Sequence, residues 1–204
     1  LWGRRDMNLF PVFQDIDNKN ILVVGGGNIA KAKISRLLQF TSRITVIAEE
    51  SDIDYVPVRI KSFSEEDLDG MDLVILAMGE PEKEIEIAKK CIEKGILVNS
   101  ASAPNAGNFY MPSLIKKGDL SIGISTGGYS PAYSRSLREE IERLIPEKID
   151  EILLRLGVIR SKLKEEIQEQ SRRSKIFREV MRLLIEKNNN VDDDEIRKIV
   201  VKYR

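Results

Sequence analysis

Apolar and polar positions along the chain alternate between short apolar runs and longer segments with helical spacing. The apolar runs predict strands, which we expect at residues 21–24, 43–48, 55–60, 72–78 and 96–99. Between them the pattern predicts helices over residues 29–40 and 81–94, and a brief helical turn over 64–68 with Ser64 as its N-cap. Strands and helices that alternate in this way indicate an α/β fold with a Rossmann-like, doubly wound parallel sheet.

The helix over residues 81–94 is expected to bury one apolar face. At helical spacing that face contains Ile85, Ala88, Cys91 and Ile92. Gly95 follows directly and suits the first position after the helix, where left-handed backbone is common. On this interpretation Cys91 is a small buried residue and not a catalytic thiol.

The alternation of strands and helices stops after residue 99. Residues 100–108 are small and polar, and the segments on either side of Lys117-Gly118 predict a β-hairpin outside the parallel sheet. A two-stranded ribbon exposes its edges, and a second copy of the chain is the expected cover. We therefore predict a dimerisation region over residues 113–146, preceded by a Rossmann-like α/β domain over residues 1–112.

Two helical regions are expected in the rest of the chain. Ser130 as N-cap and Pro131 at the first helical position predict a helix that ends before Pro146. Its apolar face contains Tyr133, Leu137, Ile141 and Leu144. Residues 147–204 then predict a C-terminal helical domain, with a break at 188–190 and a last helix that begins at the acidic residues 192–194.

The composition narrows the function and the location. The 204 residues carry 33 Lys+Arg and 33 Asp+Glu, which gives no overall attraction to nucleic acid or to a membrane. The sequence has no histidine, the commonest metal ligand and general base, and no metal site is predicted. The single cysteine excludes an intrachain disulfide and fits a reducing, cytoplasmic location. Met7 is expected to be the natural start, with residues 1–6 as an appended remnant.

A glycine-rich turn follows the first predicted strand. Gly25, Gly27 and Ala30 fit the G-x-G-x-x-G/A fingerprint, in which glycines let the backbone approach a pyrophosphate at a helix N-terminus. The cofactor is expected to be NAD, because no arginine stands immediately after the second strand to accept a 2′-phosphate. The expected cofactor-binding residues are Gly25, Gly26, Gly27, Asn28, Ile29, Ala30, Met78 and Gly79. Glu49 or Glu50 is placed to bind the ribose hydroxyls, or both are solvated loop charges.

A second glycine turn opens the helix at Pro131. It gives a second helix N-terminus that suits an anion, with basic residues nearby in the sequence. The residues expected to bind an anionic substrate are Ser125, Thr126, Gly127, Gly128, Ser130, Arg135, Arg138 and Lys116. The alternatives are an ordinary capped helix and ordinary surface charges. Basic residues in the C-terminal domain, such as Arg172, Arg173 and Lys175, lie among acidic ones and are interpreted as a solvated face.

Three elements in their order and spacing resemble the precorrin-2 dehydrogenase family, the dehydrogenase/chelatase portion of sirohaem synthases. They are residues 23–30, Val98-Asn99 with Pro112 thirteen residues beyond the asparagine, and residues 125–131. The resemblance covers about residues 8–146. It implies NAD-dependent oxidation of precorrin-2 to sirohydrochlorin by a homodimer, and some members also insert Fe²⁺.

One position departs from the family pattern. Many bifunctional members carry an aspartate, assigned as a general base, three residues after the asparagine that corresponds to Asn99; here that position is Ser102. Asn99 and Ser102 are the candidate catalytic residues. A serine hydroxyl needs a partner to act as a base near pH 7, so iron insertion lacks its expected residue, whereas hydride transfer is mainly the cofactor's chemistry.

Three hypotheses follow. The first is an NAD-dependent precorrin-2 dehydrogenase that inserts iron weakly or not at all. The second is a bifunctional dehydrogenase and ferrochelatase in which another carboxylate, such as Asp119, replaces the missing base. The third is a tetrapyrrole- or NAD-binding protein without turnover, against which the intact turn at residues 25–27 argues.

Overall fold

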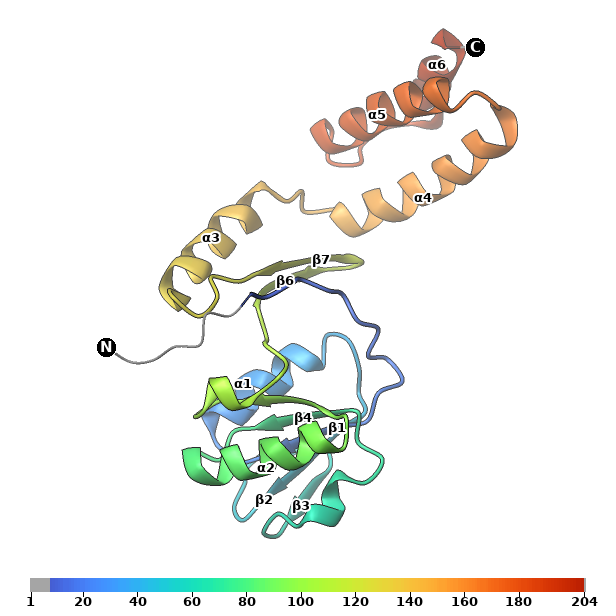
Figure 1. Ribbon diagram of the computed structural model, residues 1–204. Coiled ribbons are helices and arrows are strands. Elements are labelled where there is room, and N and C mark those ends of the chain that lie inside the picture. The colour runs from blue at the N-terminus through green and yellow to red at the C-terminus, as the bar shows by residue number, and fades with distance from the viewer. Residues whose placement is uncertain (1–7, 204) are drawn as a thin grey trace. The chain divides into compact units, whose positions relative to one another are not determined.

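The computed structural model describes residues 8–203 and divides into two compact units, which meet in the sequence between Met111 and Pro112 (Figure 1). Met7 and residues 1–6, where a natural start and an appended remnant are expected, lie outside the described residues. The finer division of the second unit at residue 146 stays a prediction.

The first unit is built on a five-stranded parallel sheet. Its strand order is β3-β2-β1-β4-β5, so β1 lies at the centre and the chain crosses it between β3 and β4. The strands are β1 (Ile21–Val24), β2 (Ile44–Ala48), β3 (Val58–Ile60), β4 (Leu73–Leu76) and β5 (Leu97–Ser100). All four pairings are parallel, which confirms the predicted doubly wound sheet.

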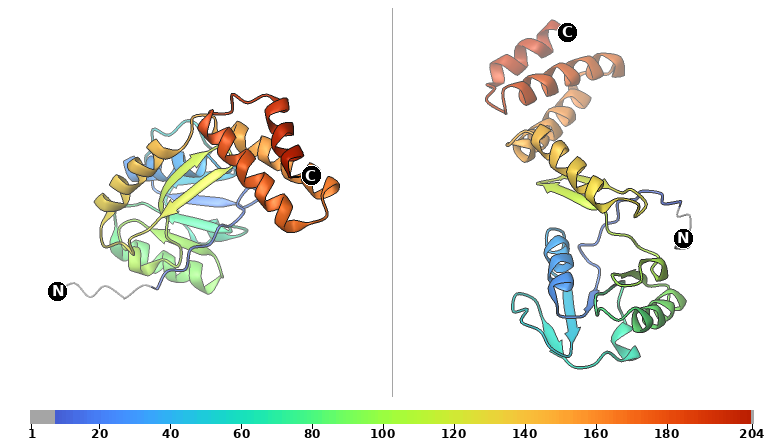
Figure 2. Two further views of the ribbon diagram at one scale, coloured as in Figure 1. Left: turned by 90° about the horizontal axis from the view of Figure 1, so that it is seen from above. Right: turned by 90° about the vertical axis from the view of Figure 1, so that its left-hand side faces the viewer.

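Two hydrophobic cores fill the two faces of this sheet. Alternate residues of β1 divide between them: Ile21 and Val23 pack with α1 (Asn28–Leu37), whereas Leu22 and Val24 pack with α2 (Pro81–Glu93). Figure 2 shows the two helices on opposite sides of the sheet. A sheet that is covered on both faces needs strands that are apolar throughout, as β1 and β4 are.

Short 3₁₀ turns complete the first unit. The first, η1 (Glu65–Leu68), has Ser64 as its N-cap, as predicted, and Asp67 accepts hydrogen bonds from the Ser64 backbone N–H and hydroxyl. The second, η2 (Pro104–Ala106), lies in the small, polar segment after β5.

The second unit joins a hairpin to four helices. Strands β6 (Ser113–Lys117) and β7 (Leu120–Ile124) pair antiparallel around Gly118, as predicted. The helix α3 (Pro131–Leu144) ends before Pro146, and α4 (Ile149–Glu166), α5 (Gln170–Glu186) and α6 (Asp193–Lys202) follow. A core of their own, which includes Ile152, Ile176, Val180 and Leu184, holds the last three helices together.

Several predicted elements are shorter in the structure, and the strand expected over residues 72–78 spans only Leu73–Leu76. The helix expected over residues 29–40 ends at Leu37, because the backbone turns through residues 38–40 and Thr41 N–H bonds back to the Leu37 carbonyl. The strand expected over 55–60 pairs only over Val58–Ile60, because Pro57 has no N–H to donate. The Pro57 carbonyl still accepts from Val46, and β3 is an edge strand.

The buried face of α2 differs from the predicted one. Ile85 and Ile92 are 38% and 46% exposed, whereas Ile87, Ala88 and Cys91 are buried. The stripe that packs on the sheet begins instead at Glu84, three residues before Ile87, and this glutamate is fully buried. Buried Cys91 is confirmed, and burial raises the pKa of its thiol to about 11.

Candidate cofactor site

The glycine turn lies where the central strand β1 ends beside β4. Gly25 has φ +121°, a conformation that only glycine adopts readily, and its N–H donates to the Ile47 carbonyl at 2.8 Å. A Cβ on Gly25 would lie 2.2 Å from the Ala77 carbonyl oxygen on the neighbouring strand's extension. The first glycine is therefore required by the fold itself.

The other two glycines differ in what surrounds them. A Cβ on Gly26 would meet the Glu50 carbonyl at 2.4 Å, so the residues after β2 press against the turn. A Cβ on Gly27 would meet nothing within 4 Å, and Gly27 has extended backbone with φ −83° that any residue can adopt. Neither packing nor backbone geometry within the chain explains a glycine at position 27.

The helix α1 begins at this open position. Gly27 is its N-cap, and no side chain caps the helix. Its first turn therefore offers backbone N–H groups and the positive end of the helix dipole beside a position with no Cβ. Both the open space and the uncapped helix fit a pyrophosphate, which would bind across residues 25–30.

A buried carboxylate joins the ends of β4 and β5. One oxygen of Glu84, Oε1, accepts from the backbone N–H of Met78 at 2.9 Å and of Gly79 at 3.2 Å. The other, Oε2, accepts from Ser100 Oγ at 2.5 Å and from Ser102 N–H at 2.9 Å. Ser102 Oγ also donates to Oε1, at 3.0 Å. Burial alone raises the pKa of Glu84, but these hydrogen bonds outweigh it and hold the pKa below its ordinary value.

A lysine from α1 binds the predicted catalytic asparagine. Lys33 Nζ donates to Asn99 Oδ1 at 2.6 Å, and Asn99 Nδ2 donates to the Phe109 carbonyl at 2.9 Å. Burial lowers the pKa of Lys33, the positive charge of Arg36 lowers it further, and Glu84 opposes both. Asn99 and Ser102 thus belong to one polar cluster with Glu84 and Lys33, at the ends of the strands.

Sequence reasoning missed Glu84 and Lys33. Glu84 stands three, four and seven residues before Ile87, Ala88 and Cys91, so it shares their helical stripe. This spacing could have indicated that Glu84 lies on the buried face of the helix. A pattern defined by apolar residues alone does not include a glutamate.

The remaining predicted cofactor residues lie around the same edge. Gly79 has φ +79°, and Met78 precedes it at the end of the β4 segment. Glu49 follows β2, is exposed, and accepts from Ser62 Oγ at 2.7 Å. Asn28 and Ile29 are exposed in the first turn of α1, whereas Ala30 is buried against the sheet.

The second glycine turn, in the second unit, is held by its own hydroxyls. Ser130 caps α3 by accepting from the Tyr133 N–H at 3.2 Å, which confirms the predicted cap. Thr126 Oγ1 accepts from the Ser130 N–H, and Ser125 Oγ accepts from the Gly127 N–H. Gly127 and Gly128 both have positive φ.

The basic residues predicted to bind substrate have different surroundings. Arg138 pairs with Glu142 at 3.0 Å and with Glu139 at 3.4 Å. Lys116 donates to the Gly118 carbonyl within the hairpin, and Arg135 is exposed on α3. The two ends of the predicted apolar face of α3 are exposed as well, with Tyr133 at 61% and Leu144 at 82%, whereas Leu137 and Ile141 are half-buried.

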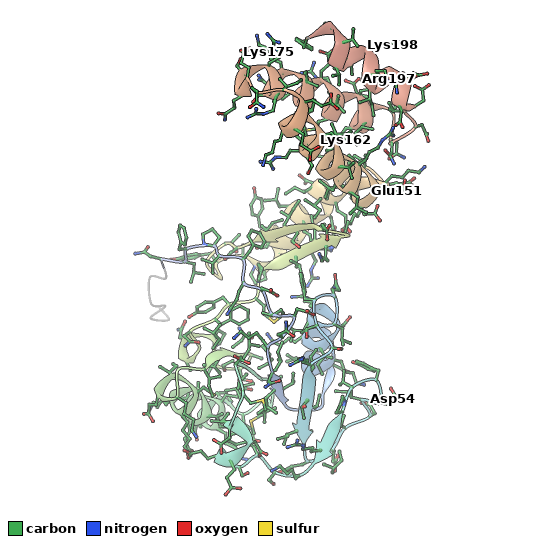
Figure 3. All side chains as sticks on the ribbon, turned by 90° about the vertical axis from the view of Figure 1, so that its right-hand side faces the viewer. Asp54, Glu151, Lys162, Lys175, Arg197 and Lys198 are labelled. Atoms are coloured by element: carbon green, nitrogen blue, oxygen red, sulfur yellow. The ribbon has the colours of Figure 1, made fainter. Side chains whose placement is uncertain are left out.

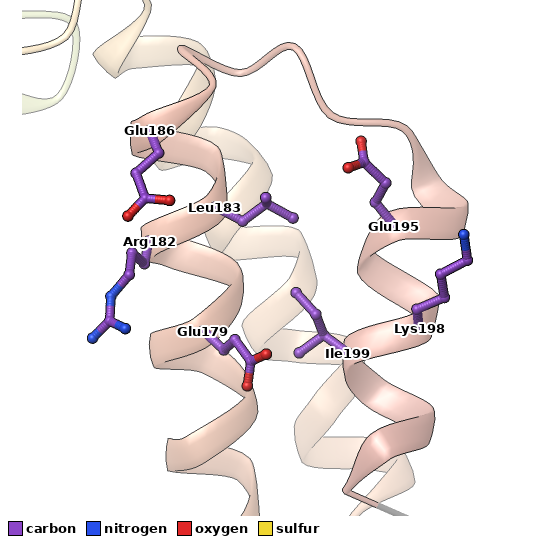
Figure 4. Close-up of a pocket in the computed structure, with 7 residues that line it drawn as sticks. All are labelled: Glu179, Arg182, Leu183, Glu186, Glu195, Lys198 and Ile199. Carbon is purple, nitrogen blue, oxygen red and sulfur yellow. The ribbon is translucent and has the colours of Figure 1, made fainter.

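A groove lies between α5 and α6, with a volume of about 410 Å³ (Figure 4). Two of its acidic residues have partners: Glu179 binds Lys202 and Tyr203, and Glu195 pairs with Lys187. These two side chains therefore take part in contacts within the helical domain itself. Its lining residues are Glu179, Arg182, Leu183, Glu186, Glu195, Lys198 and Ile199.

Charged side chains cover the C-terminal helices, among them the exposed Lys175 and Lys198 (Figure 3). Arg173 donates to the carbonyls of Ile167 and Gln168, and Arg172 pairs with Glu169. No helix within residues 8–203 combines the length and the apolar character needed to cross a bilayer. Across the same residues, no group of three or more His, Cys, Asp or Glu side chains is placed to hold a metal ion.

The central glycine turn, the open Gly27 position and the strand order define a Rossmann-type dinucleotide-binding protein. Residues 12–113 match a family model described as "Putative NAD(P)-binding", and residues 117–144 match one described as sirohaem biosynthesis protein central. The chain belongs to this NAD(P)-binding family, which confirms the expected nicotinamide dinucleotide cofactor.

The relatives extend the match beyond the first unit. A siroheme synthase from Pseudoalteromonas translucida is 34% identical over 78% of this chain and 35% of its own length. Siroheme synthase 3 from Aeromonas hydrophila is 28% identical over 86% of this chain and 39% of its own length. The chain thus spans less than two fifths of these relatives. The resemblance to the sirohaem synthase family stated from the sequence is confirmed.

A solved structure shares the fold. The chain named SirC, precorrin-2 dehydrogenase, superposes with a TM-score of 0.71 and covers 96% of this chain and 98% of its own length. The two sequences are 24% identical, so this likeness establishes the arrangement of elements.

Proposed function

We propose that this chain is an NAD-dependent dehydrogenase that oxidises precorrin-2 to sirohydrochlorin. The observation that carries the proposal is the glycine turn, where Gly27 is left open beside an uncapped helix N-terminus. The match to sirohaem biosynthesis protein central over residues 117–144 supports the tetrapyrrole as the substrate class. Relatives named siroheme synthase and a like-folded precorrin-2 dehydrogenase agree with it.

In this proposal, residues 25–30 bind the pyrophosphate through backbone N–H groups, with Met78 and Gly79 beside them. When held there, NAD⁺ would supply the acceptor for a hydride from the substrate. Asn99 and Ser102 lie at the ends of the strands, where open α/β sheets bind their ligands, and are proposed to contact the substrate.

The substrate is proposed to bind through its carboxylates. The residues offered for this role are the capped N-terminus of α3, with Ser125, Thr126, Gly127, Gly128 and Ser130, and the basic residues Lys116, Arg135 and Arg138. Arg138 would have to exchange its partners Glu139 and Glu142 for a substrate carboxylate. Exposed Arg135 makes the sharper test, and Arg135→Gln is expected to raise KM for precorrin-2 and leave NAD⁺ binding unchanged.

NAD is proposed over NADP. Glu49 is an exposed carboxylate directly after β2, a position from which an acidic residue binds the ribose hydroxyls and repels a 2′-phosphate. Calorimetric titration is expected to give tighter binding of NAD⁺ than of NADP⁺. Equal affinity, or a preference for NADP⁺, would remove Glu49 from this role.

The central experiment mixes the purified protein with precorrin-2 and NAD⁺ without oxygen and follows the absorbance of NADH and sirohydrochlorin. Both are expected to appear in equal amounts. If neither forms although the protein binds tetrapyrrole and NAD⁺ tightly, the protein is a binding protein without turnover.

Iron insertion is proposed to be weak, because Ser102 stands where the family resemblance expects an aspartate. Sirohydrochlorin and Fe²⁺ are expected to remain largely unreacted with this protein alone. Rapid formation of sirohaem would support the bifunctional alternative, and Asp119→Asn would then test whether exposed Asp119 supplies the base.

A homodimer in the cytoplasm is also proposed. The two-stranded sheet of β6 and β7 exposes its edges within its own unit, and the apolar Tyr133 and Leu144 on α3 are exposed. Light scattering is expected to give twice the chain mass. The single thiol, Cys91, is free and buried, which agrees with a reducing compartment, and cell fractionation tests the location.

A further inference from the structure

Glu84 is a fully buried carboxylate in a helix that otherwise packs apolar residues on the sheet. A buried charge is costly unless it is hydrogen-bonded, and Glu84 accepts five hydrogen bonds. The donors come from the last residue of β5, Ser100, and from the segments that follow the two neighbouring strands β4 and β5. These segments form the edge where the dinucleotide is expected to bind, so the charge is placed at the site and not at random in the core.

The direction of these hydrogen bonds fixes the state of Ser102. Ser102 contacts both carboxylate oxygens, through its N–H at 2.9 Å and its hydroxyl at 3.0 Å. Because a carboxylate can only accept, the hydroxyl proton of Ser102 points to Glu84. The Ser102 oxygen can then only accept from a further partner, and this residue is half-buried, not sealed inside the core.

We propose that Glu84 is a positioning residue of the dehydrogenase, which holds the Ser102 hydroxyl so that its oxygen accepts a hydrogen bond from an N–H group of the bound tetrapyrrole. This inference rests on the proposed function. The family resemblance expects a carboxylate at position 102, and α2 supplies one from Glu84, one hydrogen bond away. Ser102 with Glu84 therefore presents to the substrate an acceptor that a lone serine does not.

The first test replaces the carboxylate by the amide of equal shape. Glu84→Gln puts an NH₂ group against the N–H of Met78 and Gly79 or against that of Ser102, so donors face each other and Ser102 loses its fixed orientation. We expect kcat/KM for precorrin-2 to fall about 10- to 100-fold, mainly through kcat, because hydrogen bonds to charged groups are the stronger ones. Affinity for sirohydrochlorin, followed by absorbance titration, is expected to fall about tenfold.

A double-variant cycle separates positioning from general loss of packing. Ser102→Ala is expected to lower kcat/KM as much as Glu84→Gln does. The double variant is expected to lower it no further than either single variant, because both substitutions remove the same acceptor. Losses that multiply would show that Glu84 acts independently of Ser102.

Moving the charge is the sharpest test. Ser102→Asp alone places a second carboxylate against Glu84 and is expected to impair the protein. The double variant Glu84→Gln with Ser102→Asp keeps one carboxylate in the cluster. Its kcat/KM is expected to be at least tenfold higher than that of Glu84→Gln alone. A double variant no better than Glu84→Gln would overturn the inference.

Asp67→Asn is the matched control. Asp67 is also a carboxylate with little exposure that accepts several hydrogen bonds, but it lies in the turn between β3 and β4. It is expected to lower the melting temperature while kcat and sirohydrochlorin affinity stay within about twofold. Normal turnover in both Glu84→Gln and Ser102→Ala would overturn the inference about Glu84 and leave the proposed function standing. Absence of both turnover and sirohydrochlorin binding in the wild-type protein overturns the proposed function with it.

Discussion

The three glycines of the central turn allow folding and cofactor binding to be separated by substitution. Gly27→Ser adds a Cβ that would have no atom within 4 Å apart from those of the adjacent residues, on backbone with φ −83°. Serine is a better N-cap than glycine, by a few tenths of a kcal/mol. Folding stability is therefore expected to stay equal or rise slightly.

The effect on the cofactor is expected to have the opposite sign. A Cβ at position 27 occupies the space through which the pyrophosphate would reach the N–H groups of α1. We expect NAD⁺ affinity to fall at least tenfold, about 1.4 kcal/mol or more. Calorimetric titration with NAD⁺ and thermal unfolding followed by circular dichroism measure the two quantities on the same sample.

Gly25→Ala is the contrasting variant. Its φ of +121° and the 2.2 Å approach to the Ala77 carbonyl are features of the folded chain without any ligand. The backbone conformation alone costs about 1–3 kcal/mol, and about 2–4 °C of melting temperature is lost for each kcal/mol in a protein of this size. A clear fall in melting temperature is therefore expected here and not for Gly27→Ser.

Gly157→Ala serves as the control, because Gly157 lies within α4 and its Cβ also meets open space. It is expected to stabilise the protein by about 0.5–1 kcal/mol and to leave NAD⁺ affinity unchanged. If Gly27→Ser binds NAD⁺ as tightly as the wild-type protein, the open position is not the pyrophosphate site and the reasoning fails.

Three further predictions concern stability and reactivity. Arg155→Ala removes hydrogen bonds to the Val191 carbonyl at 2.7 Å and to Asp193, and is expected to destabilise the helical domain by about 1–3 kcal/mol in urea unfolding; an unchanged midpoint would contradict this. The hydrogen bonds that lower the pKa of Glu84 stabilise the folded protein at pH values above 4.5, the ordinary pKa of the group, and this stabilisation is lost as the pH falls through the lower folded-state pKa. The melting temperature of Glu84→Gln is therefore expected to depend less on pH in the acid range than that of the wild-type protein. Cys91, with its pKa raised to about 11 by burial, is expected to resist alkylation at neutral pH in the folded protein and to react once it is unfolded, as mass spectrometry would show.

Much of the first unit could be predicted from the pattern of residues alone. Apolar runs such as 21–24 and 72–78 fit strands of a sheet covered on both faces, and the glycines at 25 and 27 fit a dinucleotide fingerprint between a strand and a helix. These features are local, so the α/β class with a parallel sheet and the cofactor class follow from them. Ser130 and Pro131 likewise defined the start of α3, because a helix cap is decided by adjacent residues.

The sequence by itself therefore determined the α/β fold, the dinucleotide turn and the position of Ser102. Tertiary structure decided which face of α2 is buried. Ile85 and Ile92 lie on one side of the helix, Ile87 and Cys91 on another, and only packing against the sheet determines which side is buried. It also placed Glu84 beside Ser102, eighteen residues away along the chain. A carboxylate becomes tolerable in a core only where donors from separate strands converge on it, and that convergence exists only after β4 and β5 have paired.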